Sequence, residues 1–296
     1  MSDTQTMFSW TSQMTGNPQP GRYRLVAVDL DSSVQPNGTL HQADAAALRA
    51  AHAGGVKVAL VSAQPPQVMH RYWAQLGLGA PIIALNGALV YDFPSRKPVA
   101  GQPLEAAQVL HVLETARHVA PNTALALQHS ETWDVNQLGL AAKAMIQRSG
   151  VWPSYIGDLA GRLDDEIYQV WIGADPAQLD ALETALAHGG LSLSRYTEPN
   201  RLAVQAASVS RGWALSALAS ALEIAPNEVM AIGGGGLDRS MLQAAAFAVL
   251  VSDLGKEMEP VAGVERIAQT PGVAEALARY LAVEESEAET WPSIEP

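Results

Sequence analysis

The sequence predicts an α/β protein built around a doubly wound parallel sheet, with a second α/β module inserted into it. Three observations predict this class. Near both ends of the 296-residue chain, apolar runs of strand length alternate with amphipathic segments of helix length. Several of these runs stop at a polar or acidic residue, as buried parallel strands do where their sheet binds ligands. In the middle third aromatic residues gather, which indicates an insertion with its own small sheet.

The first predicted strand, residues 24–29, ends beside two carboxylates. Asp29 and Asp31 are separated by one residue, so in an extended chain both side chains point to the same side. Two acids at the carboxyl edge of an open α/β sheet are candidates for catalysis. A strand end followed by an Asx or serine turn explains the same residues equally well.

The next elements continue the sheet. A helix over 41–53 ends at Gly54-Gly55, and a buried strand over 57–62 ends at Ser62. The short connections imply a right-handed parallel crossover. A helix is then predicted over 67–76, a strand over 81–85 and a returning strand over 89–91. Asn86-Gly87 between the last two runs is a strong hairpin-turn signal.

The inserted module is expected from about residue 92 to residue 197. Its predicted strands lie at 168–172 and 191–193, and its predicted helices at 104–119 and 177–188. Single aromatic residues usually pack rather than bind, so most of those that gather here are expected to form the core of the module. They are Trp133, Trp152, Tyr155, Tyr168 and Trp171.

The main pattern returns after Pro199. Its predicted elements are a strand at 202–205, a helix at 212–222, a strand at 229–232, a helix at 238–246, a strand at 247–251 and a helix at 273–281. The expected division of the chain is a flexible leader over 1–20, a discontinuous main domain over 21–91 and 198–283, the inserted module over 92–197 and an acidic flexible tail over 284–296.

Composition limits the classes of function. With 48% hydrophobic and 16% charged residues the chain is typical of a globular protein, and the lack of cysteine excludes disulfides and cysteine chemistry. A formal charge of -12 argues against a nucleic-acid partner, because phosphate backbones bind basic faces. No apolar run reaches the roughly 18 residues of a membrane span, and the first residues lack the pattern of a signal peptide. We therefore expect a cytoplasmic protein without a membrane partner; its oligomeric state is not indicated.

Four features are expected at the carboxyl ends of strands in the main sheet. They are the Asp29/Asp31 pair, Ser62, the turn with Arg211, and the glycine run 233–236 with Asp238. Their order and spacing resemble the haloacid dehalogenase superfamily of phosphatases and, within it, the Cof-type sugar phosphatases with a large α/β cap. The resemblance covers roughly residues 22–282 and is most specific at 26–31, 85–92, 228–233 and 238–242. It implies a Rossmann-like core domain with the inserted module as its cap.

The resemblance also implies a mechanism in which a carboxylate attacks phosphorus. Asp29 would form an aspartyl-phosphate, which divides one difficult transfer into two easier ones. Asp31 would protonate the leaving oxygen and later activate water, so it needs an environment different from that of Asp29. The implied phosphate-binding residues are Ser62, Arg211 and Ser33. Asn86 is a candidate for binding the substrate, a small phosphorylated metabolite, although an Asn-Gly turn explains it equally well.

The implied cofactor is Mg²⁺, with Asp29, Asp31 and Asp238 as candidate ligands. The metal would let an anionic nucleophile approach an anionic phosphate. However, Gly234 stands where the family has a directly ligating aspartate, and Leu237 stands where it has an asparagine. The loss of these two ligands predicts weaker metal binding. Two unit charges about 4 Å apart, such as the Asp29 carboxylate and a phosphate, repel by roughly 4 kcal/mol at an effective dielectric near 20, so slower or lost turnover is expected.

The other departures from the family's pattern are smaller. Ser32-Ser33 replace Gly-Thr, Ser62-Ala63-Gln64 replaces a Ser-Gly-Arg-like motif, and Arg211 replaces a lysine. The glycine run 233–236 fits neither the P-loop nor the dinucleotide motif, so we interpret it as a flexible remnant of the metal loop rather than a phosphate cradle. Asp238 is equally a candidate N-cap of the helix that follows it.

Three functions remain open on the sequence. The first is a Mg²⁺-dependent phosphomonoesterase with weakened metal binding. The second, favoured by Gly234, is a catalytically degenerate relative that binds a phosphorylated ligand as a regulatory or binding protein. The third is an unrelated doubly wound protein whose aspartate pair is only a turn. Convergence of Asp29, Ser62, Arg211 and Asp238 in space would separate the third from the other two.

Overall fold

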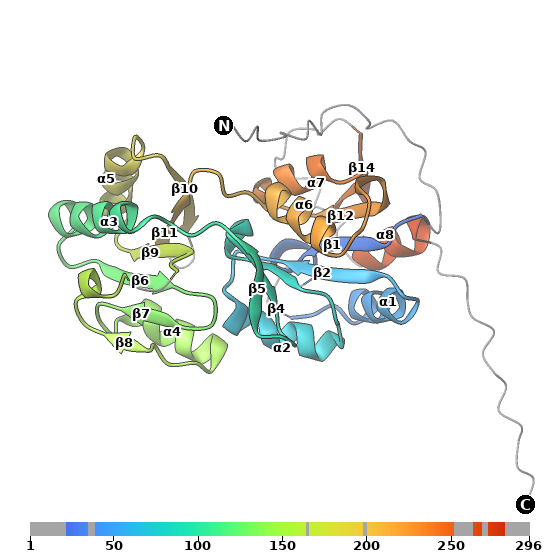
Figure 1. The fold of residues 1–296 in the computed structure, drawn as a ribbon, viewed down its shortest axis with the longest axis horizontal. Coiled ribbons are helices and arrows are strands. Elements are labelled where there is room, and N and C mark those ends of the chain that lie inside the picture. The colour runs from blue at the N-terminus through green and yellow to red at the C-terminus, as the bar shows by residue number, and fades with distance from the viewer. Residues whose placement is uncertain are drawn as a thin grey trace, which may run out of the picture.

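Two sheets lie side by side, each with helices packed on it (Figure 1). The computed structural model describes residues 22–34, 39–163, 166–197, 200–251, 263–267 and 272–281, apart from the side chains of residues 32 and 33. The leader expected over 1–20 and the acidic tail expected over 284–296 lie outside these ranges. Within them, no helix has the length and apolar character needed to cross a membrane.

Within the described ranges, the main sheet has eight strands in the order β14-β13-β12-β1-β2-β3-β4-β5. They are β1 (Leu25–Asp29), β2 (Lys57–Val61), β3 (Ile82–Ala84), β4 (Leu89–Asp92), β5 (Lys97–Gly101), β12 (Val229–Gly233), β13 (Phe247–Val251) and β14 (Val264–Ile267). The strands from β14 to β3 are parallel, and β3, β4 and β5 pair antiparallel after the predicted Asn86-Gly87 turn. The predicted doubly wound, mainly parallel sheet is therefore confirmed.

Helices cover both faces of this sheet, because alternate residues of each strand point to opposite sides. One face carries α1 (Gln42–Ala53), α2 (Pro66–Leu76) and α8 (Gly272–Tyr280), and the other carries α6 (Arg211–Ala221) and α7 (Arg239–Ala244). In β1, Val26 and Val28 belong to the apolar cluster on the first face, and Leu25 and Ala27 to the cluster on the second. The carboxyl edge of the sheet is left for the loops.

The second sheet, counted over the described residues, has six strands in the order β10-β11-β9-β6-β7-β8. They are β6 (Ala124–Gln128), β7 (Trp133–Val135), β8 (Tyr155–Ile156), β9 (Gln169–Gly173), β10 (Leu191–Thr197) and β11 (Asn200–Ala206). α3 (Ala106–Val119) and α5 (Pro176–Leu186) share one apolar cluster with it, and α4 (Leu140–Ser149) shares another. This module has its own core, as expected.

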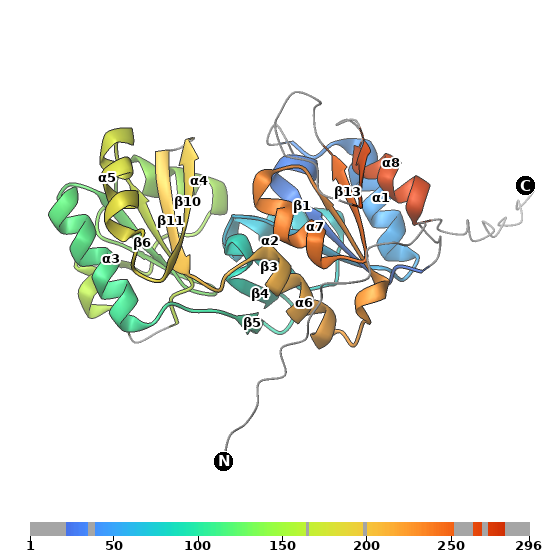
Figure 2. The same cartoon turned by 90° about the horizontal axis from the view of Figure 1, so that it is seen from above.

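The chain changes sheets at positions other than those predicted. The strand over 202–205 was expected to return to the main sheet, and this is wrong, because β11 pairs antiparallel with β9 and β10 in the second sheet. Conversely β5, which lies beyond the expected boundary at residue 92, pairs with β4. Figure 2 shows the two connections, from β5 to α3 and from β11 to α6. An apolar run reports that a strand is buried, but not which sheet buries it.

Candidate active site

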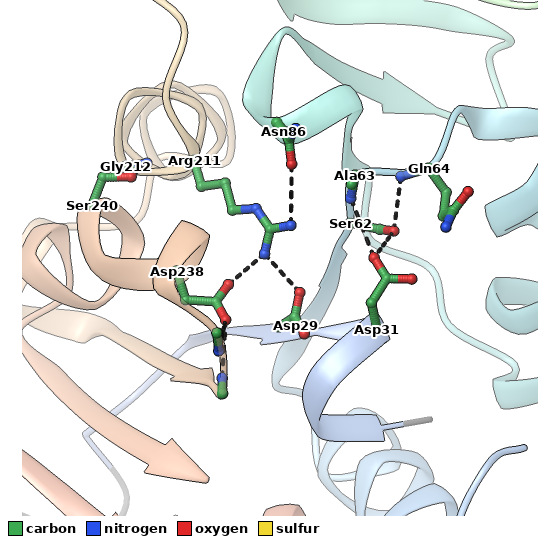
Figure 3. Close-up of polar contacts among 12 residues, drawn as sticks. Asp29, Asp31, Ser62, Ala63, Gln64, Asn86, Arg211, Gly212, Asp238 and Ser240 are labelled. Carbon is green, nitrogen blue, oxygen red and sulfur yellow. Dashed lines mark hydrogen bonds and ion pairs between the residues drawn. The ribbon is translucent and has the colours of Figure 1, made fainter. Parts of the chain in front are cut away.

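The candidate active site lies at the carboxyl edge of the main sheet, where loops after neighbouring parallel strands meet the start of α6 (Figure 3). Asp29 is the last residue of β1, and Asp31 lies in the short π-helical turn that follows. Ser62 follows β2, and Asp238 lies in the loop after β12. These residues and Arg211 converge, as the parallel order of the strands predicts. This convergence argues against the alternative that Asp29 and Asp31 only form a turn after a strand.

Arg211 is the centre of the polar contacts. Its Nη1 atom donates to Asp29 Oδ1 at 2.6 Å and also to Asp238 Oδ1. Ser210 caps α6 by accepting a hydrogen bond from the N–H of Trp213 at 3.1 Å, which holds Arg211 in the first turn beside the sheet edge. Burial opposes the charge of this guanidinium, but the carboxylates of Asp238 and Asp29 outweigh burial and raise the pKa of Arg211. Arg211 is thus a permanent cation between two carboxylates.

The glycine loop binds the side chain of Asp238. Asp238 Oδ2 accepts hydrogen bonds from the N–H groups of Gly234 at 2.9 Å and Gly235 at 2.8 Å. A Cβ on Gly233 would lie 2.7 Å from Asp238 Cβ, so this close approach needs glycine. Burial, and then the negative charge of Asp29, raise the pKa of Asp238 to about 6. Asp238 occupies the predicted N-cap position of α7, but its side chain makes no capping hydrogen bond to that helix.

Ser62 positions the second aspartate. Its Oγ atom donates to Asp31 Oδ2 at 2.5 Å and accepts from the N–H of Gln64 at 3.0 Å, while the N–H of Ala63 donates to the same Asp31 oxygen at 3.3 Å. Burial, and then the neighbouring Asp29 carboxylate, raise the pKa of Asp31. A carboxyl group with a raised pKa beside a second aspartate suits acid/base chemistry. The predicted contact of Ser62 with phosphate stays a prediction.

Asn86 links the hairpin turn to Arg211. Asn86 and Gly87 have φ angles of 55° and 95°, and a Cβ on Gly87 would lie 2.4 Å from the carbonyl oxygen of Ser210. The turn therefore packs directly against the start of α6. Asn86 Oδ1 accepts from Arg211 Nη2 at 3.2 Å, and its Nδ2 atom donates to the Tyr196 hydroxyl at 2.6 Å. Asn86 is both a turn residue and a polar side chain of the site.

The site opens into a cavity of about 290 Å³ between the two sheets. Its charged and phenolic lining residues are Asp29, Asp31, Arg211 and Asp238 from the main sheet side and Arg148, Tyr196 and Arg201 from the second. The sequence did not predict the last three, because a lone arginine or tyrosine carries no site signal before the sheets are placed together. The phosphate contact predicted for Ser33 stays a prediction, since its side chain is not described.

The described side chains do not fit the Mg²⁺ that the family's motifs imply. The carboxylates of Asp29 and Asp238 are joined by the Arg211 guanidinium, and the second oxygen of Asp238 is held by backbone N–H groups. Gly234 offers no carboxylate. Over the described part of the chain, no three or more Asp, Glu, His or Cys side chains are grouped to hold a metal ion. The metal roles of Asp29, Asp31 and Asp238 stay predictions.

A doubly wound sheet with two aspartates after one strand, a hydroxyl after the next, a cation and a third aspartate in later loops, and an inserted α/β layer defines the haloacid dehalogenase class of proteins. A model of the haloacid dehalogenase-like hydrolases matches residues 26–277, and the chain belongs to this family. The resemblance found in the motifs is therefore confirmed.

Individual relatives are more distant. The chain is 27% identical over 92 residues to the pyridoxal phosphate phosphatase YbhA of Escherichia coli, and the match spans 31% of the chain and only 34% of that protein. A haloacid dehalogenase-like hydrolase of Bacteroides thetaiotaomicron superposes with a TM-score of 0.76 at 21% identity, covering 87% of this chain and 99% of the other. The sugar phosphatase BT4131 superposes at 0.70 and 18% identity, covering 87% and 98%. These superpositions show a shared fold.

Proposed function

We propose that this chain is a phosphomonoesterase that hydrolyses a small phosphorylated metabolite, of the sugar phosphate class, through an aspartyl-phosphate on Asp29. The observation that carries the proposal is the convergence of Asp29, Asp31 and Arg211 on one cavity between the two sheets. Family membership supports it, and so do the relatives, of which one is a pyridoxal phosphate phosphatase and another a sugar phosphatase.

In the first step an oxygen of the Asp29 carboxylate attacks phosphorus. The bond from phosphorus to the leaving oxygen breaks, and that oxygen takes the proton of the Asp31 carboxyl group. The raised pKa of Asp31, caused by burial and by Asp29, keeps it protonated to higher pH than an ordinary aspartate. The Ser62 hydroxyl, 2.5 Å away, orients the Asp31 side chain for this transfer.

In the second step Asp31, now a carboxylate, accepts a proton from a water molecule that attacks the aspartyl-phosphate. The new bond joins the water oxygen to phosphorus, and the bond from phosphorus to Asp29 breaks. Inorganic phosphate leaves, Asp29 is again a carboxylate and Asp31 again carries its proton. Both groups are then ready for the next substrate.

In this proposal the positive charge that permits both steps comes from Arg211. Its Nη1 atom is 2.6 Å from Asp29 Oδ1, where a phosphate dianion must approach a carboxylate. The implied Mg²⁺ has no step in the proposal, because Gly234 leaves the loop without its ligating aspartate. Weak Mg²⁺ binding through Asp29, Asp31 and Asp238 remains the prediction made from the sequence.

The test is hydrolysis of p-nitrophenyl phosphate with Mg²⁺ and with EDTA. We expect the wild-type protein to hydrolyse this ester under both conditions. Asp29→Asn should lower kcat about 10³-fold or more relative to wild type, because the nucleophile is removed while the shape of the side chain is kept. Asp180→Asn is the matched control, since Asp180 is an exposed residue of α5 outside the cavity. Equal rates in wild type and Asp29→Asn would overturn the proposal.

A second candidate function is favoured by Gly234: a catalytically degenerate protein that binds a phosphorylated ligand in the same cavity. It predicts that a sugar phosphate such as glucose 6-phosphate raises the Tm in EDTA while no phosphate is released. Turnover that disappears in Asp29→Asn would exclude this alternative, and the absence of any thermal shift across a panel of sugar phosphates would count against it.

A further inference from the structure

The cavity contains positive charge that the proposed chemistry does not use. Its lining carries three carboxylates, of Asp29, Asp31 and Asp238, and three guanidinium groups, of Arg148, Arg201 and Arg211. Arg211 forms ion pairs with Asp29 and Asp238. Arg148 comes from α4 and Arg201 from β11, both in the second module. Over the residues that the structure describes, neither forms an ion pair with a carboxylate.

The Arg201 side chain is stacked on two aromatic rings, and one of its buried N–H groups has no hydrogen-bond partner in the described structure. It belongs to β11 and is only 8% exposed, and its guanidinium carbon lies 4.3 Å from the Tyr196 ring centroid and 4.9 Å from that of Trp171. Stacking on aromatic faces fixes the plane of the group and leaves its N–H edge for a ligand. Its Nε atom is buried without a hydrogen-bond partner in the described structure. Such a group is costly to bury unless an anion completes it.

Arg148 adds a second cation beside it. Arg148 lies in the last turn of α4, is partly buried and donates to Gln64 Oε1 in the loop after β2. Burial lowers the pKa of both arginines, and the charge of Arg148 lowers that of Arg201 further, so the two groups are close enough to repel. Both arginines line the same cavity as Asp31, whose negative charge acts on both of them.

Arginines that merely stabilise the second sheet make different contacts. Arg195 pairs with Asp180 and Glu183, and Arg162 pairs with Asp134, all within the module itself. Arg148 and Arg201 instead face the cavity, next to a core that already has the cation its chemistry needs. Two adjacent, partly desolvated cations without carboxylate partners are the arrangement expected for binding an anion.

We propose that Arg148 and Arg201 form a subsite for a second anionic group of the substrate, a carboxylate or a second phosphate, on the second-sheet side of the cavity. This inference rests on the proposed function and narrows its substrate class to small phosphate esters with two anionic groups. Guanidinium groups bind both kinds of anion through paired N–H groups. A cavity of about 290 Å³ suits a small metabolite.

The test uses two matched pairs of substrates that differ in the second anion. Glucose 6-phosphate is compared with 6-phosphogluconate, in which C1 is a carboxylate, and fructose 6-phosphate with fructose 1,6-bisphosphate, which adds a phosphate. In wild type the member with two anionic groups should have the higher kcat/KM in at least one pair. Arg201→Gln should lower that value about 10- to 100-fold, chiefly through KM, and should change the value for the member with one anionic group about 3-fold or less. Arg148→Gln should act in the same direction.

Two controls separate charge from structure. Arg117→Gln removes an exposed cation of α3 that pairs with Asp158 outside the cavity, and should alter neither pair. Arg201→Lys keeps the charge but not the stacked, planar group, and should recover only part of the preference. A wild type without preference in either pair, or an equal loss for both members in Arg201→Gln, would overturn the subsite.

Binding without turnover distinguishes failure of the subsite from failure of the proposed function. Calorimetry on Asp29→Asn and on the Asp29→Asn, Arg201→Gln double variant gives the Kd of the same four compounds. If wild type shows no turnover, the proposed function fails, while tighter binding of the member with two anionic groups that is lost in the double variant still supports the subsite. Equal Kd values within each pair in Asp29→Asn would overturn the subsite alone.

Discussion

Gly234 and Arg211 together favour a guanidinium group over a divalent metal ion as the positive charge of the candidate active site. A divalent ion needs several oxygen ligands around one point, and Gly234 has no side-chain oxygen, while its N–H group binds Asp238. Arg211 reaches both Asp29 and Asp238 from the first turn of α6, and its planar guanidinium is a more rigid group than the ammonium of a lysine on its flexible stem. The two departures from the family's pattern are therefore complementary: the loop loses a metal ligand, and a larger fixed cation joins the remaining carboxylates.

Gly234→Asp should restore a response to Mg²⁺. The φ angle of Gly234 lies outside the left-handed region, so its backbone accommodates an aspartate. We expect Mg²⁺ to raise kcat/KM for p-nitrophenyl phosphate about 10-fold or more in the variant, and about 2-fold or less in wild type, relative to EDTA. Gly236→Asp adds the same charge in the same loop, where a Cβ meets open space, and serves as the control. An equal response in the two variants would contradict a specific ligand position.

At the level of elements, a buried carboxylate joins α1 to α8. Asp44 is 2% exposed, and its Oδ1 atom accepts a hydrogen bond at 2.7 Å from the N–H of Ala274, in the first turn of α8, where N–H groups lack partners within the helix. Burial raises the pKa of Asp44 above its ordinary value of 3.8. The stability that this group contributes is then fully present below the ordinary pKa and is lost as the pH rises through the higher pKa of the folded state.

Asp44→Asn should remove this pH dependence while keeping the acceptor oxygen. The free energy of unfolding, measured with urea across the acidic range, should fall for wild type relative to the Asn variant as the pH rises. Relative to Asp44→Asn, Asp44→Ala should cost about 1 kcal/mol at every pH, because the N–H of Ala274 loses its partner. Parallel stability curves for wild type and Asp44→Asn would show that the pKa of Asp44 is not raised.

The helices and strands themselves were easier to predict than the sheet to which each strand belongs. The strands β1, β2, β12 and β13 follow from apolar runs, and α1, α2, α6 and α8 from helical spacing, with a glycine after α1 and after α2. β11 was assigned to the wrong sheet because its run of buried apolar residues matches that of a central parallel strand. β7 and β8 were missed because so few residues show no period.

On the scale of the whole molecule, half of the site could be predicted. Asp29, Asp31 and Arg211 were found because parallel order brings loops far apart in sequence to one edge. Arg148 and Arg201 could not be found in the same way, since their approach to that edge depends on how the second sheet packs over the first. The sequence therefore predicts the residues of the proposed chemistry, while the subsite proposed for Arg148 and Arg201 depends on the placement of the two sheets.

Tyr196 connects the two halves of the molecule at this point. Its hydroxyl accepts a hydrogen bond from Asn86 Nδ2 at 2.6 Å, and its ring lies 4.3 Å from the guanidinium of Arg201. Tyr196→Phe removes the hydrogen bond between the sheets but keeps the stacked ring. Asn86, which also accepts from Arg211, then holds that cation less firmly.

We therefore expect Tyr196→Phe to lower kcat/KM about 3- to 10-fold, equally for the members of each substrate pair with one and with two anionic groups, with little change in Tm. Arg201→Gln should give the opposite pattern, a loss largely confined to the member with two anionic groups. Steady-state kinetics on both variants measure this directly. A loss in Tyr196→Phe that is restricted to substrates with two anionic groups would show that Tyr196 acts through Arg201 rather than through Asn86 and Arg211.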